Sequence, residues 1–210
     1  MITIYGTAPT RSFRVIWALE ELGLPYQVRP VDLRTRMQDA EFIALNPAGF
    51  LPALHDDATG VTMVDSIAML EWLIAQPGGG KLAPAPSDPG FATYQQFLHL
   101  GESGMAAFLN IIVASRFLAP EGEKQNFGAQ AAERMFFSRL LLVSRQLGHA
   151  PMMAGDKFTA ADISVTYALG MAERLGLADR FGPEIVAYRG RIAERPAYRA
   201  ALAKWSPPAS

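Results

Sequence analysis

Hydrophobic and polar positions in the first 76 residues follow two periods, which predict alternating strands and helices. Short runs of β-branched and aromatic residues predict strands at Ile2–Tyr5, Tyr26–Val31, Leu51–His55 and Val61–Val64. Apolar residues at helical spacing predict helices at Phe13–Leu22, Ala40–Leu45 and Ser66–Ile74. This β-α-β-α-β-β-α order is typical of an α/β domain.

The chain changes character after residue 76. Residues 77–90 are rich in proline and glycine, which is typical of a linker. Beyond them, apolar residues recur only at helical spacing, with helices expected at 91–118, 125–148, 160–176, 183–194 and 197–204. The sequence therefore predicts an α/β domain over 1–76, a linker over 77–90, and an all-helical domain over 91–210.

Composition limits the chemistry that the chain can perform. Its 210 residues include 19 basic and 20 acidic side chains. The chain therefore has no excess of positive charge that would favour binding to nucleic acid or to an anionic membrane. The absence of cysteine excludes disulfides, thiolate-bound metals and a thiol nucleophile on the protein. The three histidines contain no i, i+4 pair, so no metal site is expected. Any reactive sulfur must come from a bound molecule.

Nothing in the sequence directs the chain to a membrane or out of the cell. The N-terminus has neither a basic region nor an apolar run of signal length. The apolar stretch Met105–Ala114 is too short to span a bilayer. A cytoplasmic protein is expected.

The start of the first helix is a candidate anion site. Thr10, Arg11 and Ser12 follow the first strand closely, where amide groups and the helix dipole favour a bound anion such as a thiolate. A hydroxyl there can donate a hydrogen bond to the thiolate and lower its pKa. Threonine and serine are also typical N-caps, so a purely structural role is the alternative interpretation.

Proline at the start of the third strand is a second candidate feature. Pro52 would forfeit a hydrogen bond of the sheet if it paired normally. A cis Leu51–Pro52 bond resolves this conflict and would expose the backbone of Leu51 to an extended ligand.

Asp65 and Ser66 begin the third helix. The hydroxyl and amide of Ser66 suit a carboxylate, and Asp65 could hold a neighbouring ammonium group. Together they would recognise the α-amino-acid end of a ligand. A simple N-cap is again the alternative interpretation.

These motifs occur in the order and spacing of the cytosolic glutathione transferase family, which the chain resembles over nearly its whole length. A further match is Phe158-Thr159-Ala160-Ala161-Asp162-Ile163, in which Thr159 and Asp162 form a capping box for a buried helix. The resemblance implies a thioredoxin-like N-terminal domain followed by an all-helical C-terminal domain. It points to the bacterial-type members, whose first helix begins near a Ser-Arg-Ser sequence.

The resemblance also implies residue roles. Asp65 and Ser66 would hold the γ-glutamyl end of glutathione, and Leu51 before a cis Pro52 would pair with its cysteinyl backbone. Thr10 stands at the catalytic hydroxyl position, where many relatives have serine, cysteine or a nearby tyrosine, and Ser12 is the second candidate.

Two departures from the family pattern concern the glycine end of glutathione. Met37 and Phe50 stand where relatives often have a lysine, glutamine or histidine. Arg34 or Arg36 would be the substitute partner of the glycine carboxylate, or a solvated surface arginine.

The electrophile would bind against the first long helix of the second domain, with Met105 and Phe108 as the preferred pocket residues. The alternative is that these residues belong to the core or to a dimer contact. The resemblance implies a homodimer.

The leading functional hypothesis is a glutathione transferase of the detoxifying type that conjugates glutathione, its co-substrate, to an apolar electrophile. The alternatives are a glutathione-dependent peroxidase and a binding module with little catalysis. The lack of cysteine disfavours the thiol-exchanging branches of the family and the isomerase branch.

Overall fold

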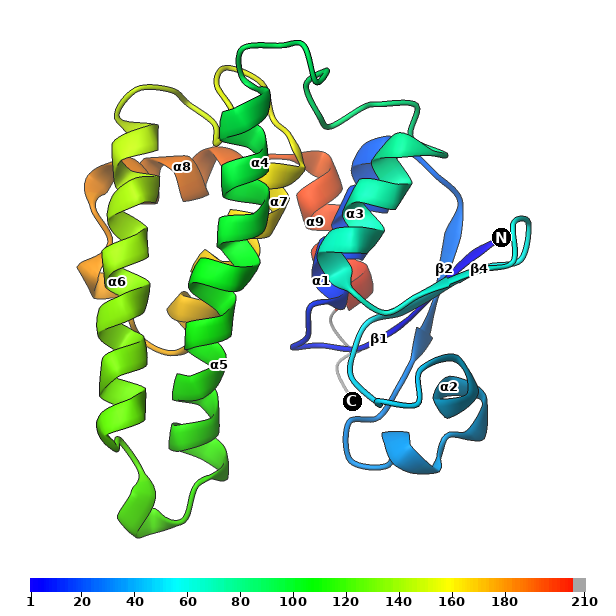
Figure 1. Ribbon diagram of the computed structural model, residues 1–210, viewed down its shortest axis with the longest axis horizontal. Helices are drawn as coiled ribbons and strands as arrows, with labels where there is room; N and C mark the ends of the chain where they lie inside the picture. Colours follow the sequence, from blue (N-terminus) through cyan, green and yellow to red (C-terminus); the bar gives the residue numbers. More distant parts are fainter. Residues whose placement is uncertain (206–210) are drawn as a thin grey trace. The chain divides into compact units, whose positions relative to one another are not determined.

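The computed structural model describes residues 1–205, which form two compact units. Residues 1–82 and 193–205 make the first unit, and residues 83–192 make the second. The chain therefore leaves the first unit, builds the second, and returns (Figure 1). This division differs from the predicted one in the last helix, which the sequence analysis placed in the second domain.

A four-stranded mixed sheet lies at the centre of the first unit, in the order β2-β1-β3-β4. Its strands are β1 (Ile2–Gly6), β2 (Tyr26–Pro30), β3 (Ala53–Asp56) and β4 (Val61–Met63). β1 runs parallel to β2 and antiparallel to β3, and β4 runs antiparallel to β3. Every residue of β1 is buried, as expected for a central strand covered on both faces.

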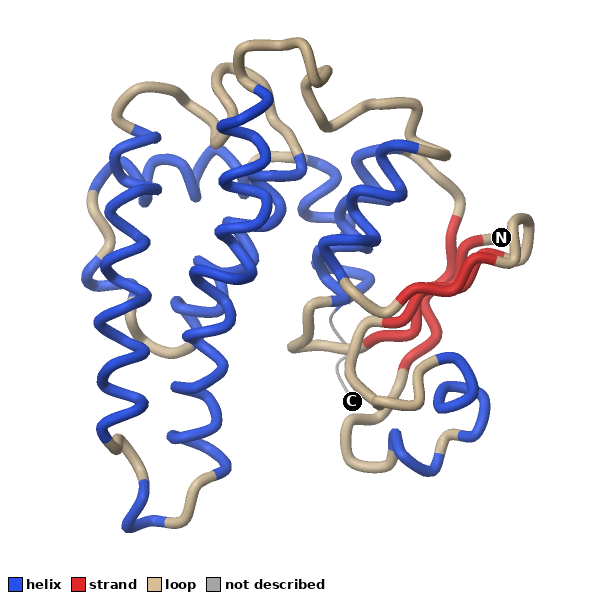
Figure 2. The backbone as a smooth tube through the Cα atoms, in the orientation of Figure 1, coloured by secondary structure: helices blue, strands red, loops and turns tan. Residues whose placement is uncertain are grey.

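Three helices cover this sheet: α1 (Ser12–Leu22), α2 (Ala40–Leu45) and α3 (Ser66–Ala75). α1 and α3 lie on one side of the sheet and α2 lies on the other (Figures 1 and 2). On the α2 side, Tyr5, Phe42 and Leu51 belong to one apolar cluster. The predicted order of strands and helices and the thioredoxin-like fold are confirmed.

The last helix, α9 (Pro196–Trp205), packs against α1. The ring of Tyr198 meets those of Phe13 and Trp17 edge-on, at centroid distances of 5.6 and 4.8 Å. Arg195 donates two hydrogen bonds to the carboxylate of Glu21, at 2.7 and 2.6 Å. Because α1 is buried on nearly all sides, it needs a second partner besides the sheet, and α9 provides it.

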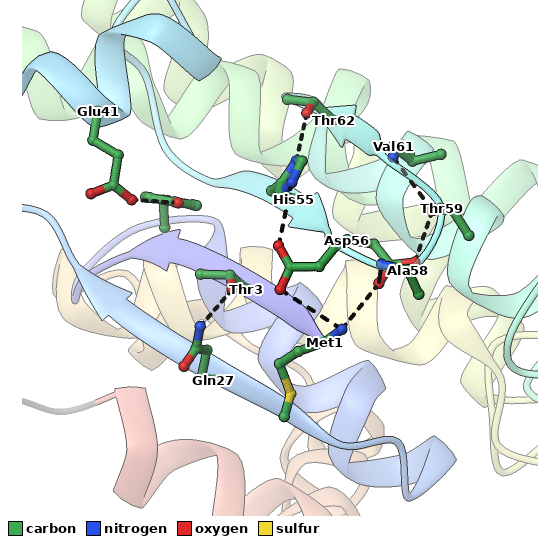
Figure 3. A network of polar contacts seen from close by, with 12 residues as sticks. Met1, Thr3, Gln27, Glu41, His55, Asp56, Ala58, Thr59, Val61 and Thr62 are labelled. Carbon is green, nitrogen blue, oxygen red and sulfur yellow. Dashed lines mark hydrogen bonds and ion pairs between the residues drawn. The ribbon is translucent and has the colours of Figure 1, made fainter.

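Polar contacts fasten the first residue of the chain to the turn between β3 and β4 (Figure 3). The α-amino group of Met1 lies 3.6 Å from Asp56 Oδ1, and the hydroxyl of Thr59 donates to Asp56 Oδ2 at 2.8 Å. The Thr59 hydrogen bond holds the pKa of Asp56 below its usual value. His55 Nδ1 and Thr62 Oγ1, 2.9 Å apart, connect β3 to β4.

The described part of the second unit is built from helices, which the sequence analysis expected. They are α4 (Phe91–His99), α5 (Ala107–Val113), α6 (Phe127–Leu147), α7 (Ala160–Arg174) and α8 (Pro183–Ala193). π-Helical turns at Leu100–Ala106 and Ala114–Leu118 join and extend α4 and α5. Single 3-10 turns lie at Arg36–Gln38 in the first unit, and at Glu121–Glu123 and Ala178–Arg180 in the second.

The continuous helical segment Phe91–Leu118 corrects one expectation. It has 28 residues and is long and apolar enough, by length and composition alone, to cross a membrane. The sequence analysis expected a helix over 91–118, but it compared only the apolar run Met105–Ala114 with the length of a membrane span. Tyr94, Phe97 and Leu109 of this segment are buried, which is typical of a core helix.

The predicted capping box at the start of α7 is present. The amide and the hydroxyl of Thr159 both donate to Asp162 Oδ2, at 2.8 and 3.2 Å. Met153 N and the hydroxyl of Tyr188 donate to Asp162 Oδ1, at 2.9 and 3.0 Å. Burial raises the pKa of Asp162, and these hydrogen bonds oppose that effect. The cap therefore joins α7 to α8 as well as starting α7.

Candidate active site

Two hydroxyl groups meet at the start of α1. Thr10 Oγ1 and Ser12 Oγ lie 2.6 Å apart, and both approach the carbonyl oxygen of Thr7. Ser12 is fully buried, whereas Thr10 is only half-buried. Thr10 is therefore the more exposed of the two hydroxyl-bearing residues.

The start of α1 offers fewer free amides than the sequence suggested. Arg11, and not Thr10, occupies the N-cap position, and its side chain makes no capping hydrogen bond. The amides of Phe13 and Arg14 donate to the carbonyls of Thr10 and Arg11, at 3.3 and 3.1 Å. The Thr10 hydroxyl also has a partner within the chain, since it donates to the carbonyl oxygen of Thr7.

Gly6, the last residue of β1, makes room for this hydroxyl pair. A Cβ atom at Gly6 would lie 2.4 Å from Ser12 Cβ and 2.7 Å from Ser12 Oγ. Real Cβ atoms do not approach other atoms so closely, so any larger residue would displace Ser12. The close packing of the end of β1 against Ser12 at the start of α1 therefore requires glycine at position 6.

The loop before β3 is held by Asn46, which is buried. Asn46 Nδ2 donates to the carbonyl of Phe50 at 2.6 Å, and Asn46 Oδ1 accepts from Ala48 N at 3.2 Å. The Leu51–Pro52 bond that follows is cis, as predicted. The pairing of β3 with β1 ends at Ala53, so the backbone of Leu51 lies outside the sheet.

The two arginines considered for a carboxylate differ in their surroundings. Arg36 donates to the carbonyl of Gly49 through Nε at 2.7 Å, and also to the carbonyl of Leu33. Arg36 therefore stabilises the backbone around it through these two hydrogen bonds. Arg34 is exposed, as are Met37 and Phe50. The structure leaves Arg34 as the more available of the two guanidinium groups.

A charged cluster anchors this loop region to the sheet. Arg29 of β2 makes a bidentate pair with Asp39, at 2.8 and 3.0 Å, and Asp39 also caps α2 by accepting from Phe42 N. The hydrogen bond from Arg29 lowers the pKa of Asp39. Tyr5 donates to Glu41 at 2.7 Å; burial, aided by Glu41, raises the pKa of Tyr5 to about 12.

Asp65 and Ser66 stand at the start of α3, as predicted. Asp65 Oδ1 accepts from the amides of Ile67 and Ala68, both at 2.9 Å, so this carboxylate caps the helix. The side chain remains exposed, and its second oxygen receives neither amide. The capping role and a ligand-binding role are therefore compatible at Asp65.

Ser66 has a partner that sequence reasoning missed. Arg14 of α1 is fully buried, and its Nη1 donates to Ser66 Oγ at 3.2 Å. A charged residue in an otherwise apolar helical run was the available signal, since buried arginines are rare unless paired. This contact brings α1, which carries Thr10, to the first residue of α3.

The two residues expected to face an electrophile lie in the second unit. Met105 is fully buried, and Phe108 is partly buried with the Arg139 guanidinium 5.2 Å from its ring centroid. Their role in binding an electrophile stays a prediction. Across residues 1–205, no three histidine, aspartate or glutamate side chains are grouped so as to hold a metal ion.

Comparison with known proteins gives one consistent result. Residues 10–76 match the model of the glutathione S-transferase N-terminal domain. Glutathione S-transferase GstB of Escherichia coli is 26% identical, over 95% of this chain and 96% of its own. A glutathione transferase of Methylococcus capsulatus superposes with a TM-score of 0.84 at 26% identity, covering 97% and 98% of the two chains. A sphingomonad glutathione S-transferase complexed with glutathione gives 0.81 at 27% identity, covering 96% and 97%.

Proposed function

This chain belongs to the glutathione S-transferase family, and from that premise we propose that it binds glutathione, ionises its thiol beside Thr10, and transfers it to an apolar electrophile. The observation that carries this proposal is the accessible Thr10 hydroxyl backed by the buried Ser12 hydroxyl, 2.6 Å away. The protein contains no cysteine, so glutathione supplies the only thiol.

The arrangement of protons supports Thr10 as the thiolate donor. Each hydroxyl has one proton and can also accept hydrogen bonds. In the structure Thr10 Oγ1 donates to Thr7 O; because Ser12 Oγ also reaches Thr7 O and Thr10 Oγ1, Ser12 can replace Thr10 as the donor to Thr7 O when the Thr10 proton turns toward a bound sulfur. A hydrogen bond to the charged form lowers the thiol pKa, so more glutathione is ionised at neutral pH.

The chemistry then needs only position and ionisation. The thiol proton passes to solvent, the thiolate attacks the electrophilic carbon, and a C–S bond forms as the leaving group departs with its electron pair. Thr10 keeps its own proton throughout and serves as a hydrogen-bond donor.

The rest of glutathione is proposed to lie along the first unit. Leu51, outside the sheet and followed by cis Pro52, would pair with the cysteinyl backbone. Asp65 and Ser66 would bind the γ-glutamyl ammonium and carboxylate at the start of α3. Arg34 is the proposed partner of the glycine carboxylate, because Arg36 is committed to backbone carbonyls.

The assembly and the second substrate are proposed from the family. We expect a cytoplasmic homodimer that serves in detoxification. A dimer mass in light scattering would support the homodimer, and a monomer mass would contradict it.

Phe108, which keeps part of its surface exposed, is the proposed contact for the electrophile.

Retention on glutathione resin and conjugation of chlorodinitrobenzene test the proposal. The wild type should be retained and active; Thr10→Ala should lose about tenfold in kcat/KM, as expected for one hydrogen bond in the transition state. Asp65→Ala should raise KM for glutathione. A wild type that is neither retained nor active would favour the binding module, and a loss with Ser12→Ala but not with Thr10→Ala would reassign the hydroxyl.

The same protein preparation separates transfer from peroxidase activity. Peroxide reduction would consume two glutathione molecules and release the disulfide, whereas conjugation forms a thioether with one. A peroxide-reducing rate well above the conjugation rate would favour the peroxidase.

A further inference from the structure

A hollow of about 390 Å³ lies in the second unit, between one face of α6 and the segment that leads into α8. This volume is in the range of small-molecule binding sites. The whole hollow is formed by residues of 83–192 and so belongs to the second unit alone. The lining residues that matter here are Arg134, Phe137, Ser138 and Leu141 of α6, together with Arg180 and Gly182.

Two polar groups on this face of α6 are free to bind a ligand. Arg134 is exposed, and its guanidinium lies 6.0 Å from the ring centroid of Phe127. Within residues 1–205 it makes no hydrogen bond or ion pair. Ser138, one helical turn further on, is exposed, and its hydroxyl has no partner in the same part of the chain. A guanidinium group has five N–H donors and no acceptor, so this pair suits an anionic group.

The carboxylate nearest to Arg134 in sequence is already occupied. Glu133 Oε1 accepts from Arg180 Nη1 at 2.7 Å, and Glu133 Oε2 lies 3.6 Å from Arg116 Nη2. The guanidinium of Arg180 also lies 3.3 Å from the ring centroid of Phe137, in the wall of the hollow. Two cations therefore share Glu133, and this part of the hollow keeps an excess of positive charge.

A second carboxylate lies at the other end of the hollow. The Ser144 hydroxyl donates to Glu184 and lowers the pKa of that carboxyl group. Ser144 is ten residues along α6 from Arg134, which corresponds to about 15 Å of helix. An anion bound at Arg134 is therefore far from this negative charge.

Apolar side chains line the hollow beside the two donors. Leu141 is 69% exposed, and the ring of Phe137 is partly buried. Arg134, Ser138 and Leu141 are spaced i, i+4 and i+7, so they lie on one face of α6. A ligand that binds both donors can thus also cover apolar surface that the chain leaves in contact with water.

We propose that this hollow binds a small amphipathic anion, whose charged group contacts Arg134 and Ser138 and whose apolar body lies against Phe137 and Leu141. The site shares no residue with the proposed glutathione site, which lies in the first unit. Binding there therefore does not depend on the transferase function.

Two fluorescent probes test this site on the full chain. One is 8-anilinonaphthalene-1-sulfonate, and the other is N-phenyl-1-naphthylamine, which has the same rings without the sulfonate. The proteins are the wild type, Arg134→Met, Ser138→Phe, and Arg145→Met as a control at an exposed arginine of α6 outside the hollow. All three substitutions are at exposed positions, so the fold should be kept, and circular dichroism checks this.

The proposal predicts that charge and shape act separately. Arg134→Met should weaken the sulfonate about fivefold, the size expected for an exposed ion pair, and leave the neutral probe nearly unchanged. Added salt should weaken the sulfonate in the wild type and much less in Arg134→Met. Ser138→Phe places a ring in the hollow and should weaken both probes, whereas Arg145→Met should change neither affinity.

Several results would overturn the proposal. They are a wild type that does not bind the sulfonate, an unchanged sulfonate affinity in Arg134→Met, and unchanged affinities for both probes in Ser138→Phe. Displacement of the sulfonate by saturating glutathione would also overturn it, because the probe would then lie in the glutathione site.

Competition in the wild type identifies the apolar body of the ligand. Displacement of the sulfonate by 1-naphthoate alone would assign the site to aromatic acids, and displacement by decanoate alone would assign it to alkyl acids. Displacement by both supports the broader class, and displacement by neither would overturn the proposal.

Discussion

At the residue scale, Thr10 and Ser12 have different proposed roles in the ionisation of the glutathione thiol. Ser12 is buried, packs against Gly6 and donates to Thr7 O, whereas Thr10 is half-buried and is the proposed donor to the thiolate. The sequence could identify both hydroxyls as candidates, because they follow the first strand at the start of a helix. It could not rank them, since their ranking depends on burial and on a 2.6 Å contact between side chains two positions apart.

Gly6→Ala tests whether this fit matters. The new Cβ would lie 2.4 Å from Ser12 Cβ, so Ser12 must move and its hydrogen bond to Thr10 should be lost. We expect about a tenfold lower kcat with a nearly unchanged KM for glutathione, because only the thiolate end is disturbed. Steady-state kinetics measures both values.

Gly190→Ala is the control for this change, because a Cβ there meets no atom within 4 Å. Equal kinetics for Gly6→Ala and the wild type would show that the packing of Ser12 does not affect the reaction.

At the scale of elements, the apolar pattern predicted most helices and strands to within a few residues. The third strand was the clearest difference: β3 begins at Ala53 and not at Leu51, because Pro52 has no amide proton for the sheet. The π-helical turns within Phe91–Leu118 were not predictable, because their apolar spacing differs little from that of an ordinary helix. Buried Arg14 was missed for a related reason: periodicity counts apolar residues only.

The short helix α2 depends on a charge pair. Asp39 accepts from Phe42 N and binds Arg29 in a bidentate pair. An Asp39→Asn side chain has one acceptor oxygen and cannot keep both contacts. We expect faster hydrogen exchange at the amides of Phe42 and Ile43, with Asp156→Asn, at an exposed position, as the control. Unchanged exchange in Asp39→Asn would show that the pair does not hold α2.

The same pair gives α2 a pH dependence whose sign can be worked out. The Arg29 hydrogen bond lowers the pKa of Asp39 below its ordinary value of 3.8 in the folded state. The stabilisation is therefore present above the unfolded-state pKa and is lost as the pH falls through the lowered folded value. Protection of α2 in the wild type should decline below pH 3.8, and Asp39→Asn should lack this decline. A decline of equal size in the variant would assign it to other carboxyl groups.

At the scale of the whole molecule, composition and periodicity predicted an α/β unit and a helical unit. They did not predict that the chain returns to the first unit with its last helix. The sequence predicted a helix at 197–204; it could not indicate which apolar surface that helix covers. The answer depends on α1, which is buried on nearly all sides and needs α9 opposite the sheet. Long-range pairing of this kind is invisible to local patterns.

Tyr198→Ala tests the contribution of α9 to the first unit. Tyr198 is buried against Phe13 and Trp17, and removing such a ring costs about 3 kcal/mol in free energy of unfolding. Urea unfolding followed by tryptophan fluorescence measures this change. Val186→Ala, at an exposed position of α8, should change it by less than about 0.5 kcal/mol. A loss below about 1 kcal/mol for Tyr198→Ala would mean that α9 adds little to the stability of this unit.

The ultraviolet difference spectrum of bound glutathione, titrated with pH, tests the central claim most directly, because the thiolate absorbs where the thiol does not. The wild type should ionise bound glutathione with a thiol pKa clearly below the value of about 8.5 that a free cysteine thiol shows. Thr10→Ala should move this pKa back toward the free value, and Thr10→Ser should keep it low. A bound thiol that titrates at the free value in the wild type, or at the same lowered value in Thr10→Ala, would contradict the account.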